Sequence, residues 1–322
     1  MKGRRYVQAF LSVLLCSLPG ALRWAGAEEV TLTYTASTLT FLAGRTALDL
    51  GFFRQEGLDV KFIQMRTAAV IPALANRHID YTMSFLPPID SALRGVPIQM
   101  QAVFVDRSLH YLVARPEIGS AADLRGKTFA LNTVDLNSST GLVYQATLRH
   151  FGLDPFKDAK WISAADSPAL FAMVQQGLAE ATFLVPPWPQ KARTAGLKVM
   201  FRAGDIYSAP LAGLSTYRRT VQEKPDQVRR MLRALIRATH FIAQPANASA
   251  VVGIVNRWLG MPEDEAAAAL NDVTFAYSDG VPRDEKSFWD VVAARTRLLG
   301  SRITAAEVAD FTIAREVRSR VK

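Results

Sequence analysis

The chain has 322 residues, and its 38 lysines and arginines against 29 aspartates and glutamates give a formal net charge of +9. The basic residues are scattered and form no stripe with stacking aromatic residues, which argues against a nucleic-acid partner. A single cysteine, Cys16, excludes a framework of disulfide bonds.

Residues 1–27 have the pattern of a secretory signal peptide. A basic start at 2–5 precedes an apolar run at 9–18, and Ala-Gly-Ala at 25–27 is typical of a cleavage site. The apolar run is shorter than the roughly 20 residues that a membrane span needs. We therefore expect export to the periplasm, by the general or the twin-arginine route, cleavage near Ala27 and a soluble mature protein.

The segment 37–63 predicts a helix followed by a strand. Ser37 or Thr40 can cap the helix, and Gly57 permits a positive φ where the chain turns into a strand at 59–63. The apolar face of this helix contains Phe41, Gly44, Leu48 and Phe52. The segment therefore predicts an αβ unit.

Strand-like and helix-like segments alternate over the first two thirds of the chain. The predicted strands are 30–34, 59–63, 81–85, 98–104, 128–131, 181–185 and 199–201. Later in the chain the predicted elements are helices, at 225–243, 246–259, 263–273, 286–299 and 304–309. The alternation predicts an α/β fold, with mostly parallel sheets that carry helices on both faces.

An internal repeat indicates two lobes. Residues 74–87 align with 174–187 at an offset of one hundred residues, and each segment has the order helix, turn, acid, strand and proline. Ligands in open α/β sheets bind beyond the carboxyl ends of the strands, so the two proline-bounded loops are expected to face one cleft.

Four motifs follow one another at characteristic spacing: LGFFRQEGLDV at 50–60, DLRGKTFA at 123–130, NSSTG at 137–141 and GLDP at 152–155. Together they resemble the nitrate/sulfonate/taurine and thiamine-pyrimidine-precursor family of periplasmic substrate-binding proteins, over about residues 30–216. The sequence departs from that family at Arg77, where a glycine is usual. We expect Asn76 to adopt the left-handed conformation in its place.

The resemblance implies a two-lobed periplasmic binding protein of type II. Lobe 1 is predicted at 28–106 and 213–322, and lobe 2 at 107–212. Two crossovers, near 106–112 and 207–214, form the predicted hinge. The family also implies closure on a small-molecule ligand and delivery to an ABC permease in the inner membrane with its ATPase; we expect a monomer.

Four segments are candidates for the ligand pocket, because each follows a strand or opens a helix. Free amides at helix starts, with hydroxyl side chains, can bind a sulfonate, carboxylate or phosphate. Helix capping is the alternative role for the same residues. The predicted ligand-binding residues are Ser37, Thr38, Thr40, Ser84, Phe85, Asn137, Ser138, Ser139, Thr140 and Trp188.

The aromatic residues Phe41, Phe85 and Trp188 predict an apolar wall, which favours an organic ligand over a small inorganic anion. Charged or titratable residues near the same loops can select the charge of the ligand. These are Arg66, Asp106, Arg107, His110 and Asp166.

No catalytic or metal-binding motif is found. The four histidines have no metal-ligand spacing, and neither a Gly-x-Ser-x-Gly elbow nor a phosphate-binding glycine loop is present. We expect a binding protein without cofactor or metal, whose ligand is an organosulfonate or small carboxylate. The alternatives are a thiamine pyrimidine precursor as ligand, an exported ligand sensor with the same fold, or an unrecognised enzyme.

Overall fold

The computed structural model describes residues 26–208 and 210–321. The predicted signal peptide, 1–27, lies almost wholly outside the described residues. Within the described ranges, no helix is long and apolar enough to cross a membrane.

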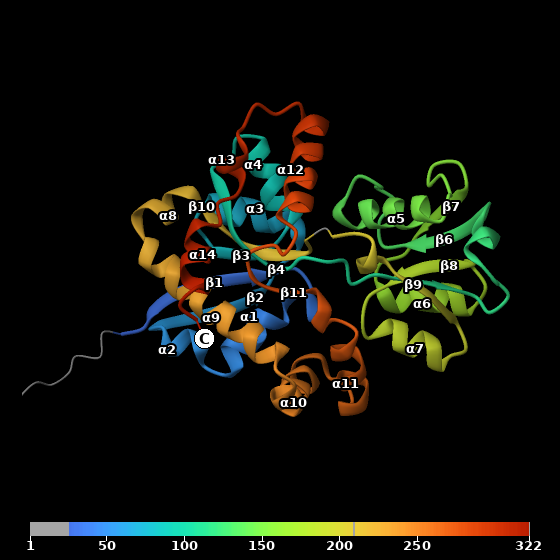
Figure 1. The fold of residues 1–322 in the computed structure, drawn as a ribbon, viewed down its shortest axis with the longest axis horizontal. Helices are drawn as coiled ribbons and strands as arrows, with labels where there is room; N and C mark the ends of the chain where they lie inside the picture. The colour runs from blue at the N-terminus through green and yellow to red at the C-terminus, as the bar shows by residue number, and fades with distance from the viewer. Residues whose placement is uncertain (1–25, 209, 322) are drawn as a thin grey trace, which may run out of the picture.

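Two separate sheets divide the chain into two lobes that lie side by side along the long axis of the molecule (Figure 1). The sheet of lobe 1 has the order β11-β4-β10-β3-β1-β2, and that of lobe 2 has the order β7-β6-β8-β5-β9. The strands of lobe 1 are β1 (Glu28–Tyr34), β2 (Leu58–Gln64), β3 (Tyr81–Ser84), β4 (Ile98–Val105), β10 (Ala212–Tyr217) and β11 (Tyr277–Gly280). The strands of lobe 2 are β5 (Tyr111–Ala114), β6 (Lys127–Leu131), β7 (Ala159–Ser163), β8 (Ala181–Leu184) and β9 (Lys198–Arg202).

Both sheets are mixed, whereas the sequence predicted mostly parallel sheets. β1 pairs in parallel with β2 and β3, and β6 pairs in parallel with β7 and β8. The pairings of β10, β11 and β5 are antiparallel. Since β5 and β10 enter their sheets directly from the other lobe, no helical crossover fixes their direction as it does in a βαβ unit.

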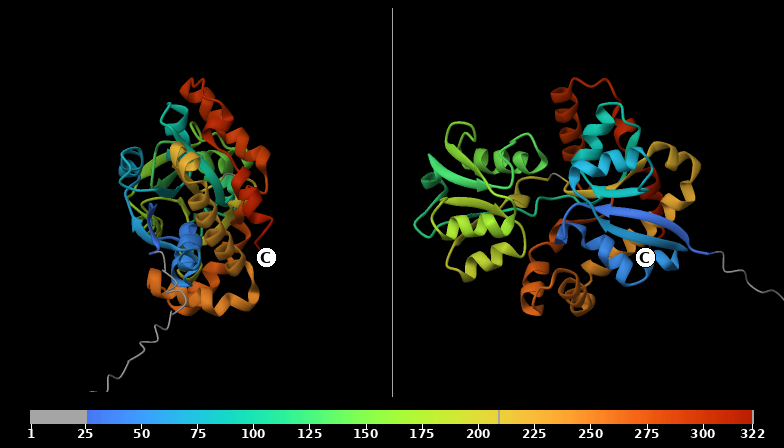
Figure 2. Two further views of the ribbon diagram at one scale, coloured as in Figure 1. Left: turned by 90° about the vertical axis from the view of Figure 1, so that its left-hand side faces the viewer. Right: turned by 180° about the vertical axis from the view of Figure 1, so that it is seen from behind.

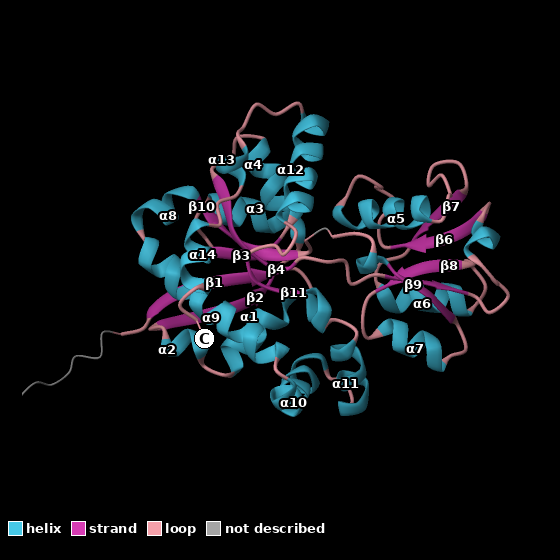
Figure 3. Ribbon diagram, in the orientation of Figure 1, coloured by secondary structure: helices cyan, strands magenta, loops and turns pink. Residues whose placement is uncertain are grey.

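Helices cover both faces of each sheet (Figure 3). The helices of lobe 1 are α1 (Leu42–Asp49), α2 (Phe52–Gln55), α3 (Thr67–Ala75), α4 (Leu86–Leu93), α8 (Arg218–Glu223), α9 (Pro225–Ala243), α10 (Ala248–Leu259), α11 (Glu263–Asn271), α12 (Glu285–Leu299), α13 (Ala305–Val308) and α14 (Thr312–Arg318). Those of lobe 2 are α5 (Ser139–His150), α6 (Ser167–Gln175) and α7 (Trp188–Thr194). Short 3₁₀ turns are η1 (Leu39–Phe41), η2 (Ala121–Leu124), η3 (Ala203–Asp205), η4 (Pro245–Asn247) and η5 (Thr274–Ala276).

Each lobe has its own apolar core. One cluster fills lobe 1 and joins its sheet to α1, α9 and the C-terminal helices. In lobe 2, one cluster lies between the sheet and α5, and another lies between the sheet and the helices α6 and α7. The bounds predicted for α9 are confirmed, because Pro225 begins it and its apolar residues repeat at helical spacing against the core.

The first αβ junction differs from its prediction in two details. Gly57 has φ 71° as predicted, but Gly51, with φ 69°, also interrupts the helix and separates α1 from α2. Neither Ser37 nor Thr40 caps the helix, because Thr38 occupies the N-cap of η1 without a side-chain hydrogen bond. The Ser37 hydroxyl instead donates to Gln64 Oε1 at 2.9 Å.

The internal repeat corresponds to α3-β3-α4 in lobe 1 and α6-β8-α7 in lobe 2. Gly177 has φ 78°, and at the equivalent position Arg77 itself adopts φ 58°. Asn76 has φ −87°, so the prediction that Asn76 would take the left-handed conformation is wrong. The turn geometry is imposed by the α-to-β connection, whichever residue stands there.

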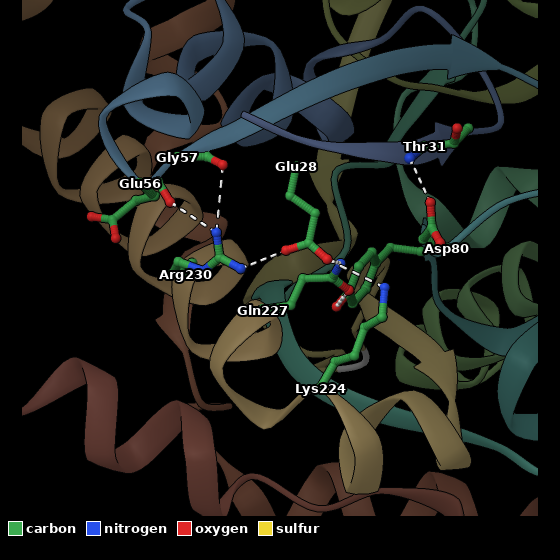
Figure 4. Close-up of polar contacts among 9 residues, drawn as sticks. Glu28, Thr31, Glu56, Gly57, Asp80, Lys224, Gln227 and Arg230 are labelled. Atoms are coloured by element: carbon green, nitrogen blue, oxygen red, sulfur yellow. Dashed lines mark hydrogen bonds and ion pairs between the residues drawn. The ribbon is translucent and has the colours of Figure 1, made fainter. Parts of the chain in front are cut away.

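The first strand begins at a polar cluster in lobe 1 (Figure 4). Glu28 accepts hydrogen bonds from Gln227 at 2.7 Å and Arg230 at 2.5 Å, and the Arg230 guanidinium also donates to the carbonyl of Glu56. These contacts fix the end of β1 that lies next to the predicted cleavage site.

Two crossovers connect the lobes, at 106–110 and, among the described residues, at 206–208 and 210–211. The Ser108 amide of the first donates to the Tyr207 carbonyl of the second at 3.4 Å, and further hydrogen bonds lie at their ends. The Leu211 amide donates to the Val105 carbonyl at 2.8 Å, and the Ala203 amide donates to the His110 carbonyl at 2.9 Å. The first crossover lies within the predicted range 106–112, and the second begins one residue before the predicted range 207–214. The exact lobe boundaries at 106 and 213, and the hinge motion, stay predictions.

Candidate functional site

Two adjoining cavities occupy the cleft between the lobes. The hinge-side cavity, of about 280 Å³, is lined by both crossovers through His110 and Leu211. The arginine-side cavity, of about 540 Å³, is lined by Asp90 and Arg295. The cavities share the lining residues Thr67, Leu86, Pro87, Asn132 and Thr140, and so form one continuous cleft.

Three of the four predicted pocket segments meet at this cleft. Thr38, Thr40 and Phe41 come from the turn after β1, and Ser84 and Phe85 come from the end of β3. From lobe 2, the start of α5 contributes Ser138 and Thr140. The carboxyl ends of β1 and β3 lie at one edge of their sheet, which is why these turns converge. Contact of these residues with a ligand stays a prediction.

Of the remaining predicted site residues, Ser37, Asn137 and Trp188 are not among the described residues that line either cavity. Ser37 is exposed and hydrogen-bonded to Gln64. Asn137 is exposed, and its backbone accepts from Arg295 and donates to Asp135. The Trp188 ring packs against Phe171 in the core of lobe 2, with ring centroids 5.5 Å apart. Ser139 begins α5, and its side chain lies outside what the structure describes.

The cleft is also lined by residues that the sequence did not predict as ligand-binding: Thr35, Thr67, Asn132, Val185 and Leu211. Asn132 follows β6 directly, at the carboxyl end of a parallel strand. The rule that located Ser84 therefore could have located Asn132. Leu211 lies on a crossover, and nothing local in the sequence marks it.

Helix capping is the observed role of Ser138. Its hydroxyl donates to the Asp135 carbonyl at 2.6 Å and accepts from the Gly141 amide at 3.1 Å. In contrast, Thr38 lines the hinge-side cavity, and its side chain makes no capping hydrogen bond to the 3₁₀ turn that follows it. The polar groups of the cleft thus divide into structural groups and groups free to bind a solute.

The sequence suggested five charged or titratable residues that could select the charge of the ligand. Among the described residues that line the cleft, His110 is the one member of that set. Its side chain is only 7% exposed, and burial lowers the pKa of the imidazole to about 4. The ring lies edge-on to Tyr144, with centroids 5.9 Å apart, and its Nδ1 is 3.1 Å from the Ser108 hydroxyl. His110 is therefore neutral at physiological pH.

Arg295 of α12 connects the two lobes across the cleft. Its guanidinium donates twice to the Asp90 carboxylate, through Nε at 2.7 Å and through Nη2. Its Nη1 donates to the Asn137 carbonyl of lobe 2 at 2.7 Å.

On α7 of lobe 2, Lys191 pairs with Glu265 of α11 at 3.3 Å, so polar contacts join the lobes at a second place. The view from behind shows the two lobes side by side as well (Figure 2, right).

The model of the family described as NMT1/THI5 like matches residues 41–248, which is more than half of the chain. The chain belongs to the NMT1/THI5-like family. No curated protein matches the chain. The match spans both lobes, both crossovers and every residue that lines the hinge-side cavity except Thr35, Ala36, Thr38 and Thr40.

Solved structures similar to this NMT1/THI5-like protein share its two-lobed fold. A putative periplasmic sulfonate-binding protein SsuA from Methylobacillus flagellatus KT superimposes with TM-score 0.72 at 17% identity, covering 92% of this chain and 95% of the other. The periplasmic nitrate-binding protein NrtA from Synechocystis PCC 6803 gives 0.67 at 15% identity, covering 92% and 89%. The desulfurization enzyme DszB gives 0.63 at 14% identity, covering 91% and 99%. At these identities the likeness concerns the fold.

Proposed function

We propose that this protein is the extracytoplasmic solute-binding component of an ABC importer. It captures a small organic solute in the cleft between its lobes and delivers it to a membrane permease that works with an ATPase. The observation that carries the proposal is the cleft at the junction of the two lobes. Its lining combines apolar side chains with hydroxyl groups, such as that of Thr38, that cap no helix. Pockets of this composition are typical of small-molecule sites.

Closure about the two crossovers would couple binding to delivery. Asp106 begins the first crossover and is held by Arg283 of lobe 1, through the Arg283 amide at 2.9 Å and its guanidinium. With Asp106 held in this way, changes in φ and ψ would fall on residues 107–110 of the first crossover and on the second crossover. A permease that recognises the closed form would then receive only loaded protein.

The cleft hydroxyls would bind a sulfonate or carboxylate, as the sequence predicts, or the carbonyl group of an uncharged solute. The sulfonate and nitrate binders among the similar structures support the first class. The family resemblance supports the second, through the thiamine pyrimidine precursors. A thermal-shift screen of the mature protein against sulfonates, carboxylates, pyrimidines and nitrate tests the proposal, because a ligand of the native state raises the melting temperature. The absence of any stabilising compound would contradict it.

An enzyme is the second candidate function, because a desulfurization enzyme has the same fold. Among the described residues, no group of three histidine, cysteine, aspartate or glutamate side chains could hold a metal. The single cysteine, Cys16, lies outside the described residues. We infer binding without chemistry. Incubation of the protein with each stabilising compound, followed by mass spectrometry, should recover the compound unchanged; conversion would establish the enzyme.

A further inference from the structure

One nitrogen of the His110 imidazole contacts Ser108; the other, Nε2, is not among the fully enclosed side-chain atoms of the described chain that lack a partner, and the residue lines the hinge-side cavity. Nδ1 is 3.1 Å from the hydroxyl oxygen of Ser108, and Ser108 is fully buried. Among the hydrogen bonds of the described chain, none uses Nε2, although the residue lines the cavity. His110 is therefore a polar group that is built into the core and left available to a solute.

Ser108 determines the tautomer of this imidazole. Its hydroxyl oxygen already accepts the backbone N–H of His110 at 3.2 Å. The hydroxyl proton needs an acceptor, because an unpaired buried donor is costly, and Nδ1 is the acceptor within reach. Nδ1 is then unprotonated, and the proton of the neutral ring lies on Nε2. The cavity therefore faces an N–H donor.

The described cleft lining offers an anion little compensating charge. Its ionised side chains are one guanidinium, that of Arg295, and two carboxylates, those of Asp90 and Asp135. Arg295 is occupied by both oxygens of Asp90 and by the Asn137 carbonyl. A sulfonate or carboxylate would thus meet a lining with an excess of negative charge.

Two helices start at the cleft; the start of α4 is a poor anion site, and at the start of α5 the Gly141 amide already donates to the Ser138 hydroxyl. The first helical residues of α4 are Leu86, Pro87 and Pro88, and a proline has no backbone N–H. Two of the amide donors that normally bind an anion at a helix N-terminus are therefore missing. Phe85 and Leu86 present apolar surface at the same place.

We propose that the cleft selects an uncharged organic solute whose carbonyl oxygen or ring nitrogen accepts a hydrogen bond from His110 Nε2–H. The inference rests on the proposed solute-binding function and names the ligand class for that site. Arg295, the one arginine lining the described cleft, acts in this arrangement as a contact between the lobes and not as the ligand's counter-ion. The position of His110 on the first crossover places the solute contact on the segment that connects the lobes.

Matched pairs of probes test the charge of the solute. Each acid is compared with its uncharged amide, starting with benzoate and benzamide and with benzenesulfonate and benzenesulfonamide, and extended to aliphatic pairs. Thermal shift and calorimetry should detect binding of the amides, with the acids at least ten-fold weaker. Binding of the acids in preference to the amides would overturn the inference and leave solute binding intact. Binding of neither member in any pair would overturn both.

Variants of His110 test the donor. His110→Phe keeps a ring but removes the N–H, and should weaken binding of the preferred amide about ten-fold, the usual effect of one neutral hydrogen bond. His110→Gln restores a donor at a similar reach and should recover most of the affinity. The matched control is His150→Phe, because His150 is exposed on α5 and stacks on Phe201 away from the cleft. Equal affinities of the His110→Phe variant and the native protein would overturn the assignment.

The tautomer can be measured without any variant. Two-bond ¹H–¹⁵N spectra of ¹⁵N-histidine-labelled protein near pH 7 should show the His110 proton on Nε2. Ser108→Ala removes the hydroxyl that donates to Nδ1 and should shift the ring toward the Nδ1–H form. A native spectrum with the proton on Nδ1 would overturn the inference, because the cavity would then face an acceptor.

Discussion

Asp80 and Glu180 lie one hundred residues apart and make the same contact in the two lobes. The Asp80 carboxylate accepts the Thr31 amide at 2.8 Å, and the Glu180 carboxylate accepts the Thr128 amide at 2.8 Å. In return, the amide of each acid donates to the carbonyl of the same threonine at 3.0 Å. Each acid thus closes the start of a parallel strand pair, and the longer glutamate reaches the same amide.

Removal of this carboxylate should destabilise its lobe. Asp80→Ala leaves the partly buried Thr31 amide without its acceptor, so we expect a loss of about 1–3 kcal/mol in the free energy of unfolding. Urea denaturation measures it. The control is Glu223→Ala, since the exposed pair of Glu223 and Arg219 should contribute less than about 1 kcal/mol. Equal losses in the two variants would refute the role of Asp80.

Arg77→Gly should stabilise the protein. Arg77 has φ 58°, a conformation that costs a residue with a side chain about 1–2 kcal/mol, and glycine adopts it freely. Loss of the Arg77 contact with the Tyr217 ring, 5.5 Å from its centroid, offsets part of the gain. Thermal and urea unfolding should show a net gain of up to about 1 kcal/mol. Asn76→Gly, at φ −87°, should show none, and a gain there instead would contradict the argument.

Gly141→Ala should disturb the start of α5 beside the cleft. An added Cβ would lie 2.3 Å from the Asp135 carbonyl oxygen and 2.4 Å from Leu136 Cα, and neither backbone atom can move freely. We expect a loss of about 1–3 kcal/mol, measured by thermal unfolding. Gly253→Ala is the control, because its Cβ would meet only the end of the Arg257 side chain at 3.3 Å. In that helix alanine should be neutral or stabilising.

The pair of Asp90 and Arg295 should show strong coupling in a double-mutant cycle. Arg295→Met leaves a largely buried carboxylate unpaired and should cost about 3 kcal/mol, whereas Asp90→Leu combined with Arg295→Met should recover most of this loss. Urea unfolding of the four proteins measures the coupling. Since both Arg295 variants also lose the contact with Asn137, small-angle scattering should show wider separation of the lobes. Additive single effects would contradict the coupling.

Stability should fall as the pH is lowered from about 6.5 to about 4, because of His110. Its pKa is about 4 in the native state and about 6.5 when unfolded, so in this window the unfolded chain binds a proton that the native state excludes. The loss approaches about 3 kcal/mol at the lower end, and above pH 6.5 His110 contributes no slope. Carboxylates with a lowered pKa, such as those of Glu28 and Asp158, add a slope of the same sign at the acid end, so urea unfolding across this range should show that His110→Phe reduces the slope and His150→Phe does not. An unchanged slope in the His110→Phe protein would contradict the assignment.

Local patterns in the sequence predicted the elements well where periodicity was strong. The helix α9 and the strands β1, β2 and β4 were found nearly residue by residue, since their apolar spacing repeats several times. The short strands β5, β7, β10 and β11 were missed. Their shortness alone is not the reason, since β3 and β8 have four residues each and were predicted. In β10 the Ala212-Gly213 start has little strand propensity.

The site was predictable as far as it depends on strand ends. Thr40, Ser84 and Thr140 lie in the cleft because each follows a strand or opens a helix, which the sequence displays. Trp188 satisfied the same rule, yet its ring packs against Phe171, since the choice between core and cleft depends on the neighbouring helix.

The sequence by itself determined the order of helices and strands, the turn at Gly57 and the duplication that relates Asp80 to Glu180, because these follow from local spacing and backbone conformation. The tertiary structure decided the direction of β5 and β10, the meeting of His110 with the cleft and the contact of Arg295 with Asn137, 158 residues away. Those features depend on how the chain crosses twice between two cores. A crossing brings together side chains that no local period relates.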